Sequence, residues 1–188
     1  MNIGASDDLA GKLAAYAALV RKWSPRLDLV ASGDLPRFED RHIADSLRLL
    51  PLARSLPPGP AVDVGSGAGL PGIPLCIAAP ARHWRLLEPR AKRAAFLEEV
   101  VRELGLTCEV VAATAEEAAR GALGASHVLA AGRALAPPAH ALELLRRLVR
   151  SDGVAAVFVG EDGDVPPEGT VWRPGIAIVE GPGPVERE

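Results

Sequence analysis

One twelve-residue segment constrains this chain more than any other: Ala-Val-Asp-Val-Gly-Ser-Gly-Ala-Gly-Leu-Pro-Gly at positions 61–72. A short β-branched run leads into a turn with glycine at every second position, Gly65, Gly67 and Gly69, and an apolar stretch of helical length follows. Glycine lets the backbone turn sharply and approach a ligand closely, because it has no Cβ. The backbone N–H groups that begin the following helix face the same space. The segment therefore predicts a nucleotide-like cofactor at the carboxyl end of a parallel sheet.

The spacing of these glycines favours S-adenosylmethionine over a dinucleotide. The dinucleotide fingerprint is Gly-x-Gly-x-x-Gly, but here the third glycine comes one residue early and Leu70 stands in its expected place. Asp63, two residues before the first glycine, suits a cofactor with a cationic end and no pyrophosphate. We therefore expect Asp63, Gly65, Gly67, Gly69 and Leu70 to hold S-adenosylmethionine. An NAD site and a glycine turn without a ligand are the alternatives.

Two glutamates near the ends of the next strands are candidates for the same cofactor. Glu88 ends a predicted strand, 19 residues after Gly69, close to the spacing at which an acid accepts the ribose hydroxyls. It is equally placed to cap the following helix, which has Pro89 at its start. Glu116 follows the third predicted strand. It is either an acceptor for the adenine amino group or an ordinary acid in the first turn of a helix.

Length and composition predict a single domain with a substantial core, made of an N-terminal helical cap over 1–58 and an α/β core over 59–188. Aromatic residues are only 4% of the chain, so Leu, Val and Ala must fill that core. No apolar run is long enough for a membrane span, and the acidic N-terminus lacks an export signal, so we expect a cytoplasmic protein. Cys76 and Cys108 are expected to be buried free thiols, and neither they nor the four histidines have metal-ligand spacing.

Strands and helices alternate beyond residue 60, which predicts an α/β fold with a mostly parallel sheet and helices on both faces. Before the sheet, helices are predicted at 7–22 and 37–56, with an irregular connector over 23–36. The strand at 153–159 is followed by another strand without a helix, which suggests an antiparallel hairpin at the sheet edge; its connector, 161–170, is expected to be mobile. The predicted strands are 61–64, 84–88, 107–112, 126–131, 153–159 and 176–179, with 171–172 as a further candidate, and the predicted core helices are 71–79, 90–104, 115–120 and 137–150.

The net charge of −3 is unevenly distributed along the chain. Residues 161–188 contain seven acidic residues and two arginines, so the remainder is slightly basic. Six basic residues gather around the second strand and its helix, at a density that suits contact with phosphate but is more often a solvated helix face. They are Arg82, Arg85, Arg90, Lys92, Arg93 and Arg102.

Two strings of residues resemble those of a known family. Residues 41–47 read Arg-His-Ile-Ala-Asp-Ser-Leu, and residues 69–74 read Gly-Leu-Pro-Gly-Ile-Pro. With these strings, the chain from about residue 13 to residue 160 closely resembles the bacterial 16S ribosomal RNA guanine-N7 methyltransferases, also called glucose-inhibited division protein B. This resemblance implies the class I methyltransferase fold with added N-terminal helices. It also implies S-adenosylmethionine as cofactor and one guanine of the small-subunit RNA as substrate.

The same resemblance implies roles for individual residues. Gly65 and Leu70 match positions at the methionine end of the cofactor, and Ala115 and Glu116 match positions at the adenine. Arg133 matches a residue at the cofactor or the target base, with a structural role at a helix start as the alternative. Three more residues match a family string at the mouth of the cofactor site: His42, Asp45 and Ser46.

Three positions depart from the family pattern. The family usually has arginine where this chain has Thr114, serine where it has Gly132, and lysine where it has Val159. These losses of RNA-facing polar groups bear on substrate binding more than on cofactor binding, and Arg173 is a candidate to compensate. A relative that only binds cofactor or RNA, or that methylates another substrate, is therefore the alternative function.

Methylation of guanine N7 requires little acid–base chemistry. N7 carries an unshared electron pair and no proton, so no general base is needed, and the rate depends mainly on aligning the base with the methyl donor. The target base must leave its stack unless it lies in an open RNA segment. We therefore expect Arg133 to position a reactant rather than to transfer a proton. We expect no metal, and a monomer whose partner is 16S ribosomal RNA or the small ribosomal subunit.

Overall fold

A single sheet of seven strands forms the centre of the computed structural model, which describes residues 3–159, 163 and 165–182, with side chains from residue 8 onward. The strands are β1 Ala61–Val64, β2 Trp84–Leu87, β3 Cys108–Val111, β4 His127–Arg133, β5 Val149–Phe158, β6 Thr170–Arg173 and β7 Ile176–Glu180. Their order is β3-β2-β1-β4-β5-β7-β6. The strands from β3 to β5 in this order are parallel, and β7 is antiparallel to both β5 and β6. This arrangement confirms the predicted α/β class.

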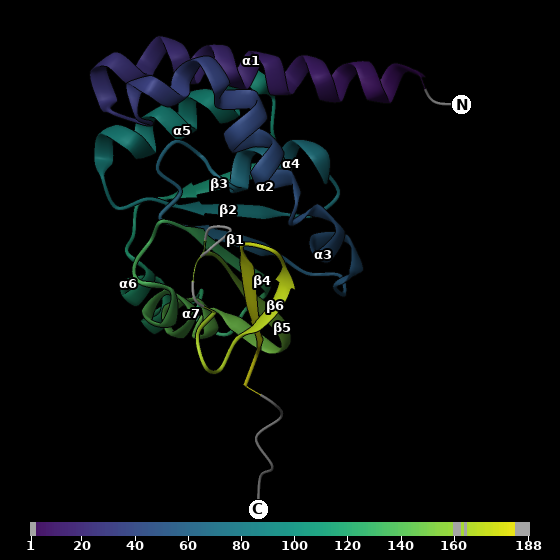
Figure 1. Ribbon diagram of the computed structural model, residues 1–188, viewed down its shortest axis with the longest axis vertical. Coiled ribbons are helices and arrows are strands. Elements are labelled where there is room, and N and C mark those ends of the chain that lie inside the picture. Colours follow the sequence, from purple (N-terminus) through teal and green to yellow (C-terminus); the bar gives the residue numbers. More distant parts are fainter. Residues whose placement is uncertain (1–2, 160–162, 164, 183–188) are drawn as a thin grey trace, which may run out of the picture.

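Helices cover both faces of the sheet. One apolar cluster joins α1 with α4 and α5, and another joins α6 and α7 to the opposite face. In Figure 1, α1 and α5 accordingly lie together at the top, and α6 and α7 lie at the lower left. The helices are α1 Ile3–Leu27, η1 Ser32–Arg37, η2 Glu39–Ile43, α2 Ala44–Leu47, α3 Leu50–Ser55, α4 Gly72–Ala78, α5 Ala91–Leu104, α6 Ala115–Arg120 and α7 Pro138–Arg146, where η1 is a 3-10 helix and η2 a π-helix.

The first strand is buried along its whole length, as a central strand of a parallel sheet requires. Successive side chains of a strand point to opposite faces. Val62 and Val64 pack in the cluster that contains α6 and α7, whereas Ala61 packs in the cluster that contains residues of α4. Asp63 therefore lies on the α4 side of the sheet, beneath the start of that helix.

Two predictions for the N-terminal segment are wrong. Helix α1 continues to Leu27, into the predicted connector, because its apolar face goes on packing against the α4 and α5 cluster. It ends before Asp28, whose φ of +48° is outside the helical range. The single helix predicted at 37–56 is instead the series η2, α2 and α3. Pro51 has no N–H for a continuing helix, and it stands at the start of α3 instead.

The far edge of the sheet also differs from the prediction. Residues 149–150, predicted as the end of the helix at 137–150, begin β5, which starts before the strand predicted at 153–159, and α7 ends at Arg146. The predicted antiparallel partner of this strand is confirmed as β7, whereas β6 pairs with β7 and not with β5. The more apolar strand takes the inner position: Ile176 and Ala177 of β7 are fully buried, whereas Val171 of the edge strand is 61% exposed. Residue 160, residues 161, 162 and 164 of the predicted mobile connector, and residues 183–188 of the acidic tail lie outside the described residues.

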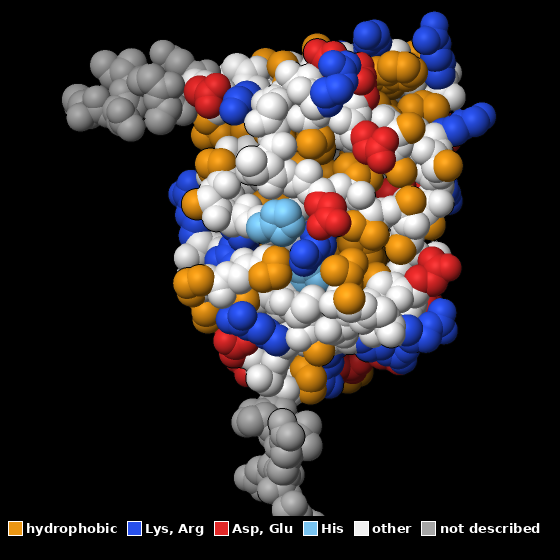
Figure 2. All heavy atoms as spheres, turned by 180° about the vertical axis from the view of Figure 1, so that it is seen from behind, with side chains coloured by type: hydrophobic (Ala, Val, Ile, Leu, Met, Phe, Trp, Pro, Cys, Tyr) orange, Lys and Arg blue, Asp and Glu red, His pale blue; other side chains and the backbone are white. Residues whose placement is uncertain are grey.

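The remaining predictions concern cysteines, metals and membranes. Cys76 is buried, but Cys108 is only partly buried because it begins β3, at the sheet edge. Among the described residues, no three His, Cys, Asp or Glu side chains are grouped as metal ligands. No helix in the described part of the chain combines the length and apolarity needed to cross a bilayer. On the face opposite that of Figure 1, apolar side chains are mixed with charged ones (Figure 2).

Candidate functional site

The glycine turn after β1 is a left-handed segment that needs glycine for two different reasons. Gly65, Gly67 and Gly69 have φ values of +69°, +56° and +99°, which L side chains rarely adopt. A Cβ at Gly65 would lie 2.8 Å from a side-chain carbon of Leu135, and one at Gly69 would lie 2.6 Å from a side-chain carbon of Ile73. At Gly67 the nearest atoms would be 3.8 Å away. The backbone of the middle glycine is therefore open to a ligand, while the outer two are packed.

Glu88 ties the turn to the end of the second strand. Its side chain is almost completely buried, and its Oε2 accepts a hydrogen bond of 2.8 Å from the Gly67 N–H. Its Oε1 accepts one of 2.9 Å from the Arg90 N–H, just before α5. A carboxylate offers about four lone-pair sites, so about two remain for a ligand. The structure thus gives Glu88 a local role at the start of α5 without exhausting its capacity to accept further bonds.

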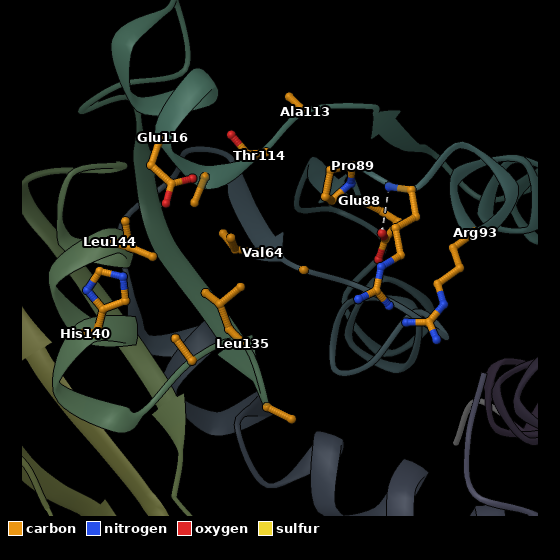
Figure 3. A pocket seen from close by; sticks show the side chains of 15 residues that line it. Val64, Glu88, Pro89, Arg93, Ala113, Thr114, Glu116, Leu135, His140 and Leu144 are labelled. Carbon is orange, nitrogen blue, oxygen red and sulfur yellow. Dashed lines mark hydrogen bonds between the residues drawn. The ribbon is translucent and has the colours of Figure 1, made fainter. Parts of the chain in front are cut away.

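A cavity of about 360 Å³ opens beside this turn, and we call it the strand-end cavity. Glu88 lies on one side of it, Glu116 and His140 lie on the other, and Val64 and Leu135 lie between them (Figure 3). Carboxylates at both ends of an apolar slot suit a nucleoside, whose hydroxyls and amino group are donors and whose base is flat and apolar. The lining residues are Val64, Gly65, Glu88, Pro89, Arg90, Arg93, Ala113, Thr114, Ala115, Glu116, Ala134, Leu135, Ala136, His140 and Leu144.

Four of the residues predicted to hold cofactor lie on this cavity: Gly65, Glu88, Ala115 and Glu116. Asp63 does not line it, because its fully buried side chain points toward α4. Its Oδ2 accepts a 3.0 Å hydrogen bond from the Gly72 N–H, and its Oδ1 is buried without a partner among the described residues. Burial raises the pKa of Asp63 to about 7. A direct contact between Asp63 and a cofactor therefore stays a prediction.

The other residues of the turn are also buried beneath the cavity. Leu70 is 5% exposed and packs with Ala68 in the cluster that contains α1 and α5. Tyr16 of α1 is fully buried, and its hydroxyl donates a 2.9 Å hydrogen bond to the Ala68 carbonyl. Tyr16 is 52 residues from Ala68 in the sequence, and only the tertiary packing of α1 brings it to the turn. This contact fixes the turn from its far side.

Thr114, where the family usually has arginine, begins α6 with a capping box. Its Oγ1 accepts a 3.2 Å hydrogen bond from the Glu117 N–H, and its own N–H donates a 2.9 Å bond to Glu117 Oε2. Reciprocal bonds of this kind fix the first turn of a helix. Since Ala115 and Glu116 belong to that turn, the cap sets the position of both at the strand-end cavity.

A second cavity of about 1070 Å³ adjoins the first, and we call it the arginine cavity. Ala134 lines both cavities, and its φ of +53° marks a sharp turn at the end of β4. The walls come from η1 to α2, from the ends of β4 and β5, and from the turn before β7. The lining residues are Arg37, Asp40, Arg41, His42, Ala44, Asp45, Arg48, Arg133, Ala134, Phe158, Val159 and Gly175.

Arg133 is held at the junction of the two cavities by groups from the N-terminal segment. Its Nη1 lies 3.0 Å from His42 Nδ1 and 3.7 Å from Asp45 Oδ2. A guanidinium only donates, so His42 Nδ1 accepts and the ring carries its proton on Nε2, 3.3 Å from Asp34 Oδ2. Burial and the charge of Arg133 lower the pKa of His42, which favours this neutral form. Arg48 donates a 2.8 Å bond to the other oxygen of Asp45 and a further one to the Pro174 carbonyl.

The remaining residues singled out from the sequence lie in different places. Ser46 lines neither cavity; it is fully buried and donates a 2.7 Å hydrogen bond to the His42 carbonyl. Val159 lines the arginine cavity. A Cβ at Gly132 would make only ordinary contacts of 3.5 Å. The position at which relatives usually carry serine therefore has room for a side chain.

Most of the six clustered basic residues are bound within the protein. Arg82 donates to the carbonyls of residues 56, 57 and 59. Arg85 pairs with Glu109, and Arg102 with two glutamates of its own helix. Arg93 donates to the Asp28 carbonyl and, with Arg90, lines the strand-end cavity, and Lys92 is exposed. Cavity residues after the fourth strand, such as Leu135 and His140, went unpredicted, although the rule that ligands sit at strand carboxyl ends points to that loop.

Comparisons with known proteins identify relatives of this chain. The family model described as rRNA small subunit methyltransferase G matches residues 10–164. Ribosomal RNA small subunit methyltransferase G of Granulibacter bethesdensis is 40% identical over 158 residues, which cover 84% of this chain and 71% of that protein.

Solved structures show the same fold at low sequence identity. A protein from Corynebacterium glutamicum matches with a TM-score of 0.63 at 14% identity, over 92% of each chain. A mutant of MtNAS in complex with S-adenosylmethionine matches with a TM-score of 0.59 at 16% identity, over 97% of this chain and 79% of that one.

Proposed function

This chain belongs to the family of rRNA small subunit methyltransferase G, and we propose that it transfers a methyl group from S-adenosylmethionine to N7 of one guanine in 16S ribosomal RNA. The observation that carries the proposal is the strand-end cavity, which runs from Glu88 beside the open backbone of Gly67 to Glu116. Its volume of about 360 Å³ falls in the range of small-molecule sites, about 300–1,000 Å³. Action on the small ribosomal subunit implies a cytoplasmic enzyme, and we propose that it works as a monomer.

The residues of the strand-end cavity fit S-adenosylmethionine. Glu88 keeps lone pairs for the two ribose hydroxyls, and the backbone at Gly67 is open to a ligand. Apolar side chains offer a slot for the adenine ring, and Glu116 is placed to accept from its amino group. We propose that Asp63, Gly69 and Leu70 serve the same cofactor from beneath, by fixing the shape of the turn.

The main task of the protein in this reaction is to align the methyl donor with the target base. S-adenosylmethionine supplies an electrophilic methyl group on its sulfonium. Guanine N7 has a free electron pair and no proton to lose, so the protein needs no general base. Holding the two reactants in contact and in the right orientation accounts for a large part of the rate enhancement in such a reaction. We propose that Arg133, held by His42 at the junction of the cavities, positions the base.

Two measurements test this function. Calorimetry should show binding of S-adenosylmethionine and not of NAD. The protein should then methylate small subunits purified from a strain that lacks its gene, and mass mapping should place the new methyl group on one guanine. The same assay with protein-free RNA decides whether the assembled particle is required. Cofactor binding without transfer to either substrate would favour the alternative of a relative that only binds, and tighter binding of NAD would refute the cofactor assignment.

A further inference from the structure

We infer that Asp45 and Arg133 together read the base edge of the target guanine inside the arginine cavity. The inference rests on the proposed function and adds the means by which guanine is chosen.

The arginine cavity is the place next to the methyl donor that has room for a base. With about 1070 Å³ it is the larger of the two cavities, and it meets the strand-end cavity at Ala134. The left-handed φ of +53° at Ala134 turns the chain sharply there, so the Arg133 side chain lines only the larger cavity. Backbone strain of this kind is concentrated at functional sites. A base extruded from RNA into this cavity lies beside the strand-end cavity.

The Watson–Crick edge of guanine presents the O6 acceptor next to the N1–H and N2–H donors. A cation beside a carboxylate complements this order: arginine donates to O6, and the carboxylate accepts from N1–H and N2–H. Enzymes that act on an extruded base read this same edge. Adenine offers a donor and an acceptor in the opposite order at the corresponding positions, so the same pair rejects it. Holding this edge leaves N7, on the other side of the ring system, free to face the methyl donor.

Both side chains are fixed in place while keeping free atoms. Asp45 Oδ1 is bound by Arg48, which is anchored in turn to the Pro174 carbonyl. Asp45 Oδ2 lies 3.7 Å from Arg133, beyond hydrogen-bond distance, so both groups can bind adjacent atoms of one base edge. The side chain of Arg133 is 19% exposed and that of Asp45 is 29% exposed, which leaves them accessible from the cavity but largely desolvated. Preorganisation of this kind lowers the cost of ordering groups on binding.

Inosine at the target position tests the inference with the unmodified protein. Inosine keeps O6, N1–H and N7 but lacks the N2 amino group. We expect kcat/KM to fall about tenfold relative to guanosine, because loss of one hydrogen bond to a charged group costs about one factor of ten or more. Equal rates on guanosine and inosine would overturn the inference. Absence of methylation on guanosine itself would refute the proposed function instead.

The variant Asp45→Asn assigns that preference to one residue. The amide keeps the size of the side chain but replaces one acceptor with a donor. We expect kcat/KM on guanosine to fall about 100-fold. The ratio of kcat/KM on guanosine to kcat/KM on inosine should fall from about ten to about one. The matched control is Asp152→Asn, which also removes an aspartate from an arginine pair but lies on the exposed start of β5, and it should keep both values.

Calorimetry with S-adenosylmethionine and a melting curve show whether the Asp45→Asn protein is folded and loaded. A folded variant that keeps the guanosine preference of the unmodified protein would overturn the inference. The result with inosine on the unmodified protein stands whether or not the variant folds.

Discussion

The two cavities that meet at Ala134 are built in different ways. In the strand-end cavity the polar contacts of Glu88 go to backbone N–H groups, and the walls come from loops that follow consecutive strands. In the arginine cavity side chains bridge distant segments: His42 contacts Arg133, 91 residues away, and Arg48 donates to the backbone carbonyl of Pro174, 126 residues away. A site made of backbone tolerates little change in its turn. A site made of side chains can be altered one residue at a time without disturbing the first.

The departures from the family pattern follow this division. Thr114, at the strand-end cavity, replaces a usual arginine with a capping box that fixes the cavity wall. Val159 lies on the arginine cavity, where a usual lysine is lost. Under the proposed function, the cavity assigned to the cofactor keeps its geometry, while the cavity assigned to the substrate loses charge. Arg37, Arg41 and Arg48 at the same cavity retain a positive lining.

The largest effect should come from Glu88→Ala, which removes the carboxylate common to the turn and the cavity. Two hydrogen bonds to a charged group are worth about 1.5–3 kcal/mol each, so we expect affinity for S-adenosylmethionine to fall about 1,000-fold. The measurement is calorimetry, with Glu99→Ala as the control because Glu99 pairs with Arg102 on the surface of α5, away from both cavities. Affinity within about threefold of the unmodified protein would exclude Glu88 from the cofactor site.

Arg133→Gln separates the two cavities by function. We expect kcat/KM with small subunits to fall about 100-fold, because a charged donor is lost at the base. The affinity for S-adenosylmethionine should change by less than about threefold, because Arg133 lines only the arginine cavity. If the affinity for S-adenosylmethionine instead fell as much as kcat/KM, Arg133 would be assigned to the cofactor carboxylate. The two cavities would then not divide into one for the cofactor and one for the base.

The ionisation of Asp63, beneath the glycine turn, should make the stability of the protein depend on pH. Its pKa of about 7 lies above the value of an unfolded aspartate, so the folded protein binds the proton more tightly. Its contribution to stability is therefore full below about pH 4 and is lost as the pH rises through about 7. Asp63→Asn keeps an oxygen for the Gly72 N–H and has no proton to lose.

The free energy of unfolding of Asp63→Asn, relative to the unmodified protein, should accordingly rise by about 2 kcal/mol between about pH 5 and about pH 7.5. Denaturant titrations at the two pH values measure this difference. A difference that does not change with pH would mean that Asp63 ionises normally in the folded protein.

Four of the residues assigned to the cofactor from the sequence line the strand-end cavity, because the signals that named them are local. The glycine turn and Glu88 each follow a strand directly, and parallel strands bring their carboxyl ends to one edge. Asp63 was expected at the ligand because it is near the turn in sequence, although strand alternation places it on the α4 side, opposite Val62 and Val64.

The arginine cavity could not be predicted from local sequence signals of this kind. His42, Asp45 and Ser46 were singled out only through the resemblance, and nothing local indicated that Arg133 or the turn at Pro174 would lie beside this segment. The order of β6 and β7 was also unpredictable from spacing, because either strand can pair with β5 and only the burial of Ile176 and Ala177 decides which one does. Pro51, by contrast, was a local indication that 37–56 is not one helix.

The smallest effect should come from a packing link that runs between the cavities. Tyr16 bonds to the glycine turn through Ala68, and its ring contacts Phe38, whose ring contacts His42; each pair of ring centroids is 5.6 Å apart. Tyr16→Phe keeps the rings and removes the hydroxyl. We expect a loss of about 1 kcal/mol in unfolding free energy and a fewfold weaker binding of S-adenosylmethionine, with an unchanged guanosine-to-inosine ratio.

The control for this variant is Ser55→Ala, which removes a hydroxyl bonded to a backbone carbonyl at the end of α3, away from both cavities. It should lower stability by a similar amount, about 1 kcal/mol, and leave cofactor affinity unchanged. If Tyr16→Phe also behaved in this way, its hydroxyl would matter for folding alone. If it altered the base preference, the aromatic link would transmit the state of the turn to His42 and Arg133, and the two cavities would have to be treated as one site.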